Sequence, residues 1–365
     1  MNEKLIYISE IYLPSSSAHA VHVAKMCEAF AQNKIEVTLI CLRNNLSIKE
    51  FKKTYNIKVN LNIISILKKS KSLNFFTRII YAFRIIKLLK TSKKKNFIIS
   101  RSILSSMILS FIGYKNLLEV HHKTSGLTSV IFRLFKRLNL LKNITYILIN
   151  KSLKQHFIGK NDNKYLILDD AVSLKDFNLK KKEKKYSNTC VYVGSFYPGK
   201  GAEIIYELAK KCQKVNFHLY GDKKFLQIKK KLENIKFFNY VRYSKISKIL
   251  TKYDVALMPY AKKNYGRGNL EISDSISPLK MFEYMASKKI ILASNLKAYN
   301  HILKHNYNSL LLDPENIDQW SENIKKIFKK KKKYLALRIN AFNTVKKYTW
   351  YKRSKIILEK FRLFY

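Results

Sequence analysis

The stretch SPLKMFEYMASKKIILAS, residues 277–294, decides how this chain folds. Ser277 is a favourable N-cap and Pro278 a favourable first residue of a helix, so a helix is predicted to begin here. An apolar stripe that includes Leu279 gives this helix a side that faces the core. The apolar run at 290–294 has the length of a buried strand. A helix that leads into a short buried strand is one step of a βα repeat.

Strands and helices continue to alternate on both sides of this stretch. Further strands are predicted at residues 4–9, 37–42, 59–66, 96–99, 117–120 and 146–149, and again at 189–194, 215–221, 235–241, 254–260 and 309–313. Two successive series of this kind predict an α/β protein with two Rossmann-like, doubly wound parallel sheets. Ligands of such sheets bind beyond the carboxyl ends of the strands, so a cleft between the halves is the expected site.

A lysine-rich run, KKKEKK at 180–185, separates the two series. We therefore assign an N-terminal domain to residues 1–178 and a C-terminal domain to residues 186–345. The final segment, 346–365, has the apolar stripe of a helix and is expected to cross back onto the N-terminal domain.

The composition is that of a strongly basic protein. The 365 residues include 72 Lys and Arg against 24 Asp and Glu, a formal net charge of +48. Such a charge attracts phosphate-bearing partners, although a lysine-favouring genome would give the same count without any function. The four cysteines form no CxxC pair, which favours a reducing cytoplasm and disfavours structural zinc. The sequence shows neither a secretory leader nor an apolar run long enough to cross a bilayer.

Lys280 and Glu283 lie about one turn apart in the predicted helix, on a face beside the apolar stripe. The positive end of the helix and the Lys280 ammonium group suit a diphosphate, and the Glu283 carboxylate suits the hydroxyls of a ribose. An ordinary exposed Lys–Glu pair has the same spacing, so spacing alone leaves both interpretations open.

The whole segment closely resembles the SPLKxFEYMA signature of glycosyltransferase family 4, the group 1 glycosyl transferases. The resemblance implies a two-domain GT-B fold, with the nucleotide-sugar donor in the C-terminal domain and the acceptor in the N-terminal domain. It assigns the ribose to Glu283, and the diphosphate and sugar to residues 277–279 and Lys280. Many members carry a glutamate where this sequence has Ser275, which leaves open whether Ser275 or Asp274 meets the donor sugar.

A second segment, VYVGSFYPGKG at 191–201, combines a strand with a glycine-rich turn that allows close approach of the backbone to an anion. By itself such a turn is more often a solvated loop. The segment resembles the G-x-x-x-x-x-K-G element of the same family, which implies that Gly199 and Lys200 contact the donor diphosphate. Ser195 stands where an arginine often accompanies this lysine, and Arg267 is a candidate replacement.

Candidate acceptor residues follow the predicted strands of the N-terminal half. Ser16, Ser17 and His19 lie in the loop YLPSSSAHAVH, at 12–22, where ligands of a doubly wound sheet collect. His19 is favoured over His22 as a contact to phosphate or acceptor hydroxyls.

The segment LLEVHHKTSG, at 117–126, places Glu119 and His121 at the end of a strand. It resembles the E-x-H element of the family, which implies that His121 sits beside the reacting anomeric carbon with Glu119 as its companion. Arg101 resembles an arginine that follows the preceding strand in many members. A purely structural role is the alternative for each of these residues.

Together these assignments predict a retaining, metal-independent glycosyltransferase without a cofactor, whose catalytic residues are His121, Glu119, Lys200 and Lys280. The leaving diphosphate would accept the proton of the acceptor, while Lys200, Lys280 and the helix dipole stabilise its charge. The sequence has no Asp-x-Asp motif to hold a metal ion on the diphosphate. The family implies a glycan or lipid-linked acceptor in the synthesis of cell-surface polysaccharide or lipopolysaccharide.

Two other classes of function stay open. The same fold can carry a sugar-nucleotide epimerase or a phosphorylase, and the charge also suits a non-enzymatic protein that binds nucleic acid or a membrane. Residues 74–95 interleave apolar and basic side chains, as a helix lying on an anionic membrane does. This pattern predicts a cytoplasmic enzyme that docks peripherally on the inner face of the membrane, and an ordinary helix with a basic outer face is the equal alternative.

Overall fold

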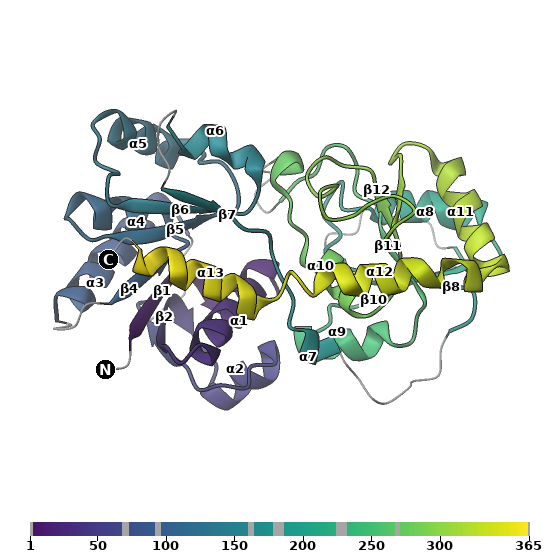
Figure 1. Ribbon diagram of the computed structural model, residues 1–365, viewed down its shortest axis with the longest axis horizontal. Helices are drawn as coiled ribbons and strands as arrows, with labels where there is room; N and C mark the ends of the chain where they lie inside the picture. Colours follow the sequence, from purple (N-terminus) through teal and green to yellow (C-terminus); the bar gives the residue numbers. More distant parts are fainter. Residues whose placement is uncertain are drawn as a thin grey trace. The chain divides into compact units, whose positions relative to one another are not determined.

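Two compact units divide the chain in the computed structural model, which describes residues 3–67, 73–91, 96–159, 164–177, 186–223, 232–266 and 271–363 (Figure 1). Unit 1 consists of Met1–Asp169 and Trp350–Tyr365, and unit 2 of Asp170–Thr349. Each unit is built around its own parallel sheet.

The sheet of unit 1 has seven described strands in the order β3-β2-β1-β4-β5-β6-β7, all paired in parallel. Their bounds are β1 Lys4–Leu13, β2 Glu36–Asn44, β3 Asn62–Ser65, β4 Phe97–Ser100, β5 Asn116–Val120, β6 Ile144–Leu148 and β7 Tyr165–Ile167. The strand order reverses between β1 and β4. In doubly wound sheets ligands bind beside such a reversal, at the carboxyl ends of the strands.

Helices cover both faces of this sheet. Ile8 of β1 packs in one core cluster with Tyr81 of α3, whereas its neighbour Tyr7 faces Phe30 of α1, because successive strand side chains point to opposite faces. The helices of the α3 face are α3 Phe75–Thr91, α4 Ile103–Phe111 and α5 Gly126–Arg137. The opposite face carries α1 Ala18–Gln32 and α13 Trp350–Arg362, which pack on each other. Two shorter helices are α2 Ile48–Tyr55 and α6 Lys154–Phe157.

Unit 2 repeats this plan with six described parallel strands in the order β10-β9-β8-β11-β12-β13. Their bounds are β8 Thr189–Val193, β9 Asn216–Tyr220, β10 Ile235–Phe238, β11 Val255–Met258, β12 Ile290–Ser294 and β13 Leu310–Leu312. The described helices are α7 Leu174–Phe177, α8 Ala202–Lys211, α9 Tyr243–Leu250, α10 Leu279–Ala286, α11 Ile317–Lys329 and α12 Leu335–Val345. The order reverses between β8 and β11, next to the loops that follow these strands.

The predicted α/β architecture with two doubly wound parallel sheets is confirmed. One local prediction is wrong: Ser277 does not cap the key helix. Pro278 has an extended backbone, with ψ 122°, so the helix begins at Leu279 and Pro278 is its N-cap. The Ser277 hydroxyl instead accepts a hydrogen bond of 2.9 Å from the backbone N–H of Asp170.

The run at 180–185 and Arg267 lie outside the described residues. No helix in the described part of the chain is both long enough and apolar enough to cross a membrane.

Candidate active site

Helix α10 is buried on nearly all sides, including the face that carries its charged residues. The side chains of Met281, Phe282 and Met285 lie in the core of unit 2. Lys280 is only 9% exposed and Glu283 only 5% exposed. An ordinary surface ion pair would be largely solvated, so these exposures rule out that interpretation of the spacing.

Lys280 lies beside the second predicted donor lysine, Lys200. Both ammonium groups approach the ring of Tyr260, with Lys200 Nζ 5.1 Å and Lys280 Nζ 5.0 Å from its centroid. Lys280 Nζ also lies 3.8 Å from the centroid of Tyr192. The absence of a side chain at Gly194 makes room for it, since a Cβ atom there would overlap the Lys280 ammonium group. Two strand ends and one helix thus bring two buried cations together.

The electrostatics of this pair are unfavourable without an anion. Burial lowers the pKa of Lys200 to about 8. Burial, and then the neighbouring charge of Lys200, hold the pKa of Lys280 well below its usual value. Neither ammonium group forms a salt bridge with a carboxylate of the described residues. A buried pair of like charges is typical of a site that binds the opposite charge.

Glu283 follows Lys280 one turn along α10, close enough for the two charges to interact. The pKa of its carboxyl group is raised to about 7. Burial is the main cause, Lys280 counteracts it in part, and the negative charge of Asp170 adds to it. Asp170 is buried, and its backbone is held by Ser277 at the start of α10. Asp170 was not predicted as a site residue from the sequence, because nothing local in the segment 166–177 indicates that it returns to this helix.

The glycine-rich loop between β8 and α8 forms the turn that the sequence predicted. Gly199 and Gly201 have φ of 75° and 109°, a left-handed conformation that side chains other than glycine rarely adopt. The Tyr192 hydroxyl donates a hydrogen bond of 2.7 Å to the carbonyl of Ser195 and lies 3.1 Å from the carbonyl of Lys200. This tyrosine therefore ties both ends of the loop to the strand.

The predicted contacts to the donor sugar lie in a short helical turn just before α10. Ser275 is buried, and its hydroxyl lies 3.4 Å from the carbonyl of Ile272. Asp274 is exposed, as is Glu271, which accepts a hydrogen bond from Ser273. A contact of Ser275 or of Asp274 with the donor sugar therefore stays a prediction.

The predicted residues of unit 1 gather around a fully buried carboxylate, that of Glu119. His22 Nε2 lies 2.7 Å and His121 Nε2 3.2 Å from Glu119 Oε1, and the Tyr7 hydroxyl donates to Oε2 at 2.6 Å. Arg353, from α13, donates to Oε1 at 2.7 Å. Burial alone would raise the pKa of Glu119, but Arg353, His22 and the hydrogen bond from His121 outweigh it and hold the pKa well below its usual value.

His19 and Arg101 border the same cluster. His19 Nε2 lies 2.9 Å from the Ser9 hydroxyl. Burial, followed by the charges of Arg101, His121 and His22, keeps the pKa of His19 well below its usual value, so its imidazole is neutral at neutral pH. Arg101 Nη1 is buried without a hydrogen-bond partner among the described residues. The structure thus groups His19, Arg101, Glu119 and His121 at the carboxyl ends of β1, β4 and β5.

The two predicted serines, Ser16 and Ser17, do not belong to the buried centre of this cluster. Ser16 and Ser17 are exposed. Ser17 is the N-cap of α1 and accepts a hydrogen bond from the backbone N–H of Ala20. Its hydroxyl therefore has a structural use, and any contact to a ligand stays a prediction.

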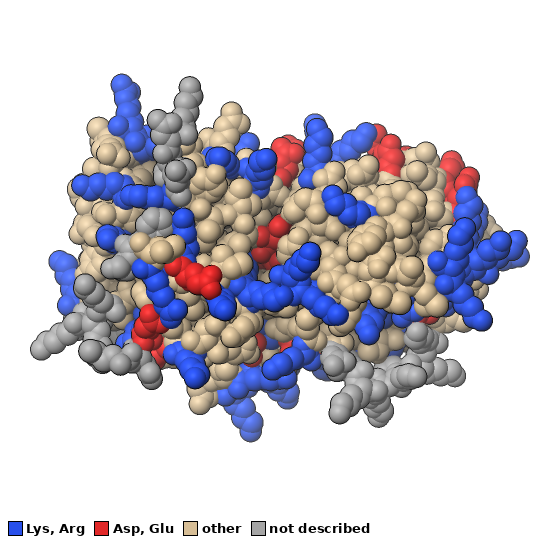
Figure 2. All heavy atoms as spheres, in the orientation of Figure 1, with Lys and Arg blue, Asp and Glu red and all other residues tan. Residues whose placement is uncertain are grey.

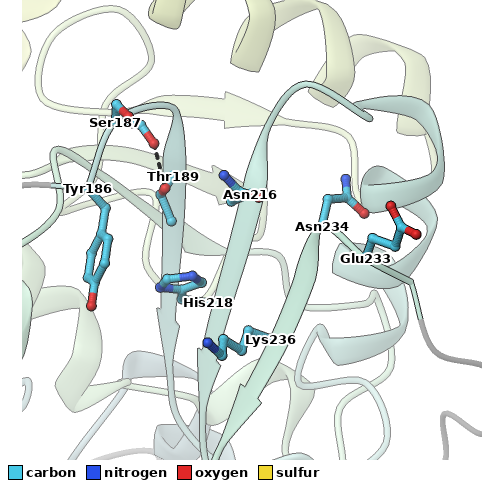
Figure 3. Close-up of a pocket in the computed structure, with 8 residues that line it drawn as sticks. All are labelled: Tyr186, Ser187, Thr189, Asn216, His218, Glu233, Asn234 and Lys236. Carbon is cyan, nitrogen blue, oxygen red and sulfur yellow. Dashed lines mark hydrogen bonds between the residues drawn. The ribbon is translucent and has the colours of Figure 1, made fainter.

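The described residues of unit 2 also contain a cavity that is not part of either group. It has a volume of about 360 Å³ and lies along the amino-terminal halves of β8, β9 and β10, where Asn216, His218 and Lys236 point into it (Figure 3). Because the donor candidates follow the carboxyl ends of β8 and β11, this cavity lies toward the other edge of the sheet.

Known structures share this architecture over nearly the whole chain. A glycosyltransferase from Rickettsia africae matches with a TM-score of 0.73 and 16% identity, covering 98% of each chain. Anabaena HepE in complex with UDP and glucose matches with a TM-score of 0.70 and 13% identity, covering 98% of this chain and 99% of that one. WaaG, a glycosyltransferase involved in lipopolysaccharide biosynthesis, matches with a TM-score of 0.66 and 10% identity, covering 97% of this chain and 99% of that one. The protein therefore has the GT-B fold.

The sequence identifies the family. Residues 175–344, nearly all of unit 2, match the family described as Glycosyl transferases group 1. This segment belongs to the group 1 glycosyl transferases, and the protein is a glycosyltransferase. No protein of curated function matches it by sequence.

Proposed function

We propose that this enzyme transfers a sugar, with retention of anomeric configuration, from a nucleoside diphosphate sugar held by unit 2. The observation that carries the proposal is the pair of buried ammonium groups, Lys200 and Lys280, which share the ring of Tyr260 beside Glu283. A diphosphate supplies the negative charge that this pair lacks. Glu283 then accepts hydrogen bonds from the ribose hydroxyls, and the start of α10 faces the diphosphate and sugar.

The proposed reaction is a front-face displacement. The bond from the anomeric carbon to the diphosphate oxygen breaks, and a bond from that carbon to the acceptor oxygen forms on the same face. The acceptor proton passes to the leaving diphosphate oxygen. Lys200 and Lys280 stabilise the charge that develops on the diphosphate, in a site where water screens it little.

The transfer is proposed to need no metal ion or cofactor. Two ammonium groups bring to the diphosphate the positive charge that a divalent cation would otherwise supply. Chelation of divalent ions with excess EDTA is therefore expected to leave the transfer rate unchanged. A rate that collapses with EDTA and returns with added Mg²⁺ would contradict this part of the proposal.

The cluster of unit 1 is proposed to serve the acceptor side. Because Glu119 is fully buried, we infer that it positions His22 and His121 rather than touching the substrate. His121, His19 and Arg101 then present their polar atoms to the acceptor. A glycan or lipid-linked acceptor in cell-surface polysaccharide or lipopolysaccharide synthesis, in the cytoplasm, is supported by the likeness to WaaG and by the family.

Isothermal titration with UDP-, GDP- and ADP-sugars tests the donor site. One nucleotide is expected to bind, as UDP does in the HepE complexes. Glu283→Ala and the isosteric Glu283→Gln are each expected to weaken binding by on the order of a hundredfold, since they remove charged hydrogen bonds to the ribose. Glu322→Ala, on the exposed surface of α11, is the matched control. Unchanged affinity in both Glu283 variants, with unchanged melting temperatures, would refute the site assignment.

Product analysis separates transfer from the other reactions of this fold. With the nucleotide that binds and a panel of glycan and lipid-linked acceptors, a glycosylated product is expected together with free nucleoside diphosphate. Free diphosphate without any glycosylated product, or a donor altered only in configuration, would favour hydrolysis or an epimerase.

A further inference from the structure

Helix α3 of unit 1 carries an apolar stripe on its outer side. Phe76, Ile80 and Phe83 follow at helical spacing, and Phe76 is 73% and Phe83 61% exposed. The opposite side of the same helix, with Tyr81 and Ile85, is buried in the core. The helix therefore has two apolar faces, and only one of them is needed to hold it on the sheet.

The neighbouring helices α4 and α5 extend this apolar surface. Phe111, at the end of α4, is 60% exposed and contacts Phe135 of α5, with their ring centroids 6.0 Å apart. On α5, Leu127, Val130 and Leu134 form a second exposed stripe, which Leu138 continues just beyond the helix. Since α3 packs on α4 and α4 on α5, the three helices form one layer. We call its outer side the α3–α5 face.

The charged residues of α3, α4 and α5 are all basic. Between Glu50 and Asp162 the sequence contains a single acidic residue, Glu119, which is buried and paired with Arg353 of α13. Exposed basic residues alternate with the apolar ones, namely Arg84, Lys87 and Lys90 on α3 and Arg133, Lys136 and Arg137 on α5. Figure 2 draws the side of the molecule on which α13 lies in front, and there too Lys and Arg are far more widespread than Asp and Glu.

We propose that the α3–α5 face docks on an anionic lipid bilayer. Apolar side chains that stand out of a helix enter the boundary between headgroups and acyl chains, and long basic side chains beside them reach the headgroup phosphates. The charge selects anionic lipid, because each basic residue near the surface is attracted to the negatively charged headgroups. A nucleic acid would use the basic residues but would leave exposed phenylalanines and leucines without a partner.

Vesicle flotation of the full chain tests the apolar part of the proposal. Binding is expected to vesicles of phosphatidylglycerol and phosphatidylcholine in equal parts, and to be much weaker with phosphatidylcholine alone. Phe76→Ser and Phe83→Ser are each expected to lower the partition coefficient about tenfold, because each removes a large side chain from the lipid. Ile339→Ser, which replaces a 58% exposed apolar residue of α12 in unit 2, is the matched control and is expected to bind as the native protein does.

Charge variants test the electrostatic part. The triple variant Lys87→Gln, Arg133→Gln and Arg137→Gln is expected to lower binding to anionic vesicles by on the order of a hundredfold. The control is Lys330→Gln, Lys332→Gln and Lys333→Gln, which removes the same charge from exposed lysines of unit 2. It is expected to bind almost as the native protein does, since the control residues lie outside the α3–α5 face.

Three outcomes would overturn the proposal. Equal losses in both triple variants would show that net charge alone drives binding. Unchanged binding of both phenylalanine variants would show that the apolar stripe does not enter lipid. Tighter binding to duplex or single-stranded nucleic acid than to vesicles at physiological salt, weakened by the charge variants only, would assign the face to nucleic acid. All these measurements are made without donor or acceptor, so their outcomes do not depend on whether the proposed transfer is correct.

Discussion

Lys200 is the residue whose protonation should report donor binding. Its pKa is lowered to about 8 by burial, and a bound diphosphate raises the pKa of an adjacent ammonium group. At pH 9, about one unit above the free value, donor binding is therefore expected to take up close to one proton through Lys200, and at pH 8 about half a proton. Isothermal titration in buffers of different ionisation enthalpy measures this uptake directly.

The same argument gives the pH dependence of affinity. Because only the protonated lysine attracts the diphosphate, affinity is expected to fall as the pH rises above about 8, by up to tenfold for each unit. Lys200→Met is the control, and it should bind more weakly and lose the uptake that Lys200 contributes. Equal proton uptake in the native protein and in this variant would show that Lys200 is not the group that titrates.

Gly194 is expected to matter for binding and much less for folding. A Cβ atom at this position would overlap the end of the Lys280 side chain, which is flexible and can move away. Gly194→Ala should therefore displace the Lys280 ammonium group and weaken donor binding about tenfold, with little change in melting temperature. Isothermal titration and thermal unfolding of the same sample measure the two effects.

Gly201 provides the contrast to Gly194. It has φ 109°, and a Cβ atom there would meet the backbone carbonyl of Pro259, which cannot move independently. Gly201→Ala is therefore expected to destabilise unit 2 by about 1–3 kcal/mol. If Gly194→Ala lowered the melting temperature as much as Gly201→Ala does, the proposed role of Gly194 would be wrong.

At the level of elements, helix α13 holds the centre of the unit 1 cluster through Arg353. Arg353→Met leaves the Glu119 carboxylate buried without its guanidinium partner, and is expected to destabilise the protein by about 3–5 kcal/mol in denaturant unfolding. Adding Glu119→Gln removes the unpaired charge, so the double variant is expected to be more stable than Arg353→Met alone by at least about 1 kcal/mol. Lys355→Met, on the exposed side of α13, serves as the control. Additive effects of the two substitutions would contradict the coupling.

The ion pair also predicts how stability depends on pH. The pKa of Glu119 is depressed in the folded protein, so its contribution is fully present above the unfolded value, about 4.3, and is lost as the pH falls toward the folded value. Native protein is expected to lose stability below about pH 4 more steeply than the double variant, which lacks this carboxyl group. Parallel stability curves for the two proteins would contradict this assignment.

What the sequence could predict at this scale was local. Helix α10 and strand β12 follow from apolar periodicity, and the glycines at 199 and 201 from the needs of a tight turn. Arg353 could not be found in this way, because it meets Glu119 across 234 positions and nothing in its own segment marks it as buried. The ring of Tyr260, between the two lysines, was likewise hidden, since a tyrosine in an apolar strand segment usually means only core.

On the scale of the whole molecule, the two units use one architectural rule twice. In each sheet the strand order reverses beside the first strand, and the polar clusters follow the carboxyl ends of the strands next to that reversal. The charges differ: unit 2 collects buried ammonium groups, whereas unit 1 centres on a buried carboxylate with histidines. This difference is consistent with the proposed division of labour, in which unit 2 binds an anionic donor and unit 1 a hydroxyl acceptor.

The net charge of +48 allows a last test, which separates specific donor binding from general attraction to anions. Association of a basic protein with duplex nucleic acid loses on the order of a thousandfold or more in affinity between about 50 and 200 mM salt. Nucleoside diphosphate sugar is expected to lose less than about tenfold over the same range, because buried charges are screened far less than exposed ones. Titrations of both ligands at several salt concentrations measure the two slopes, with Lys280→Met as the variant that lacks one buried charge. If the sugar nucleotide showed the steep slope of the nucleic acid, its binding would come from the exposed lysines of the surface, and the buried pair would not be the donor site.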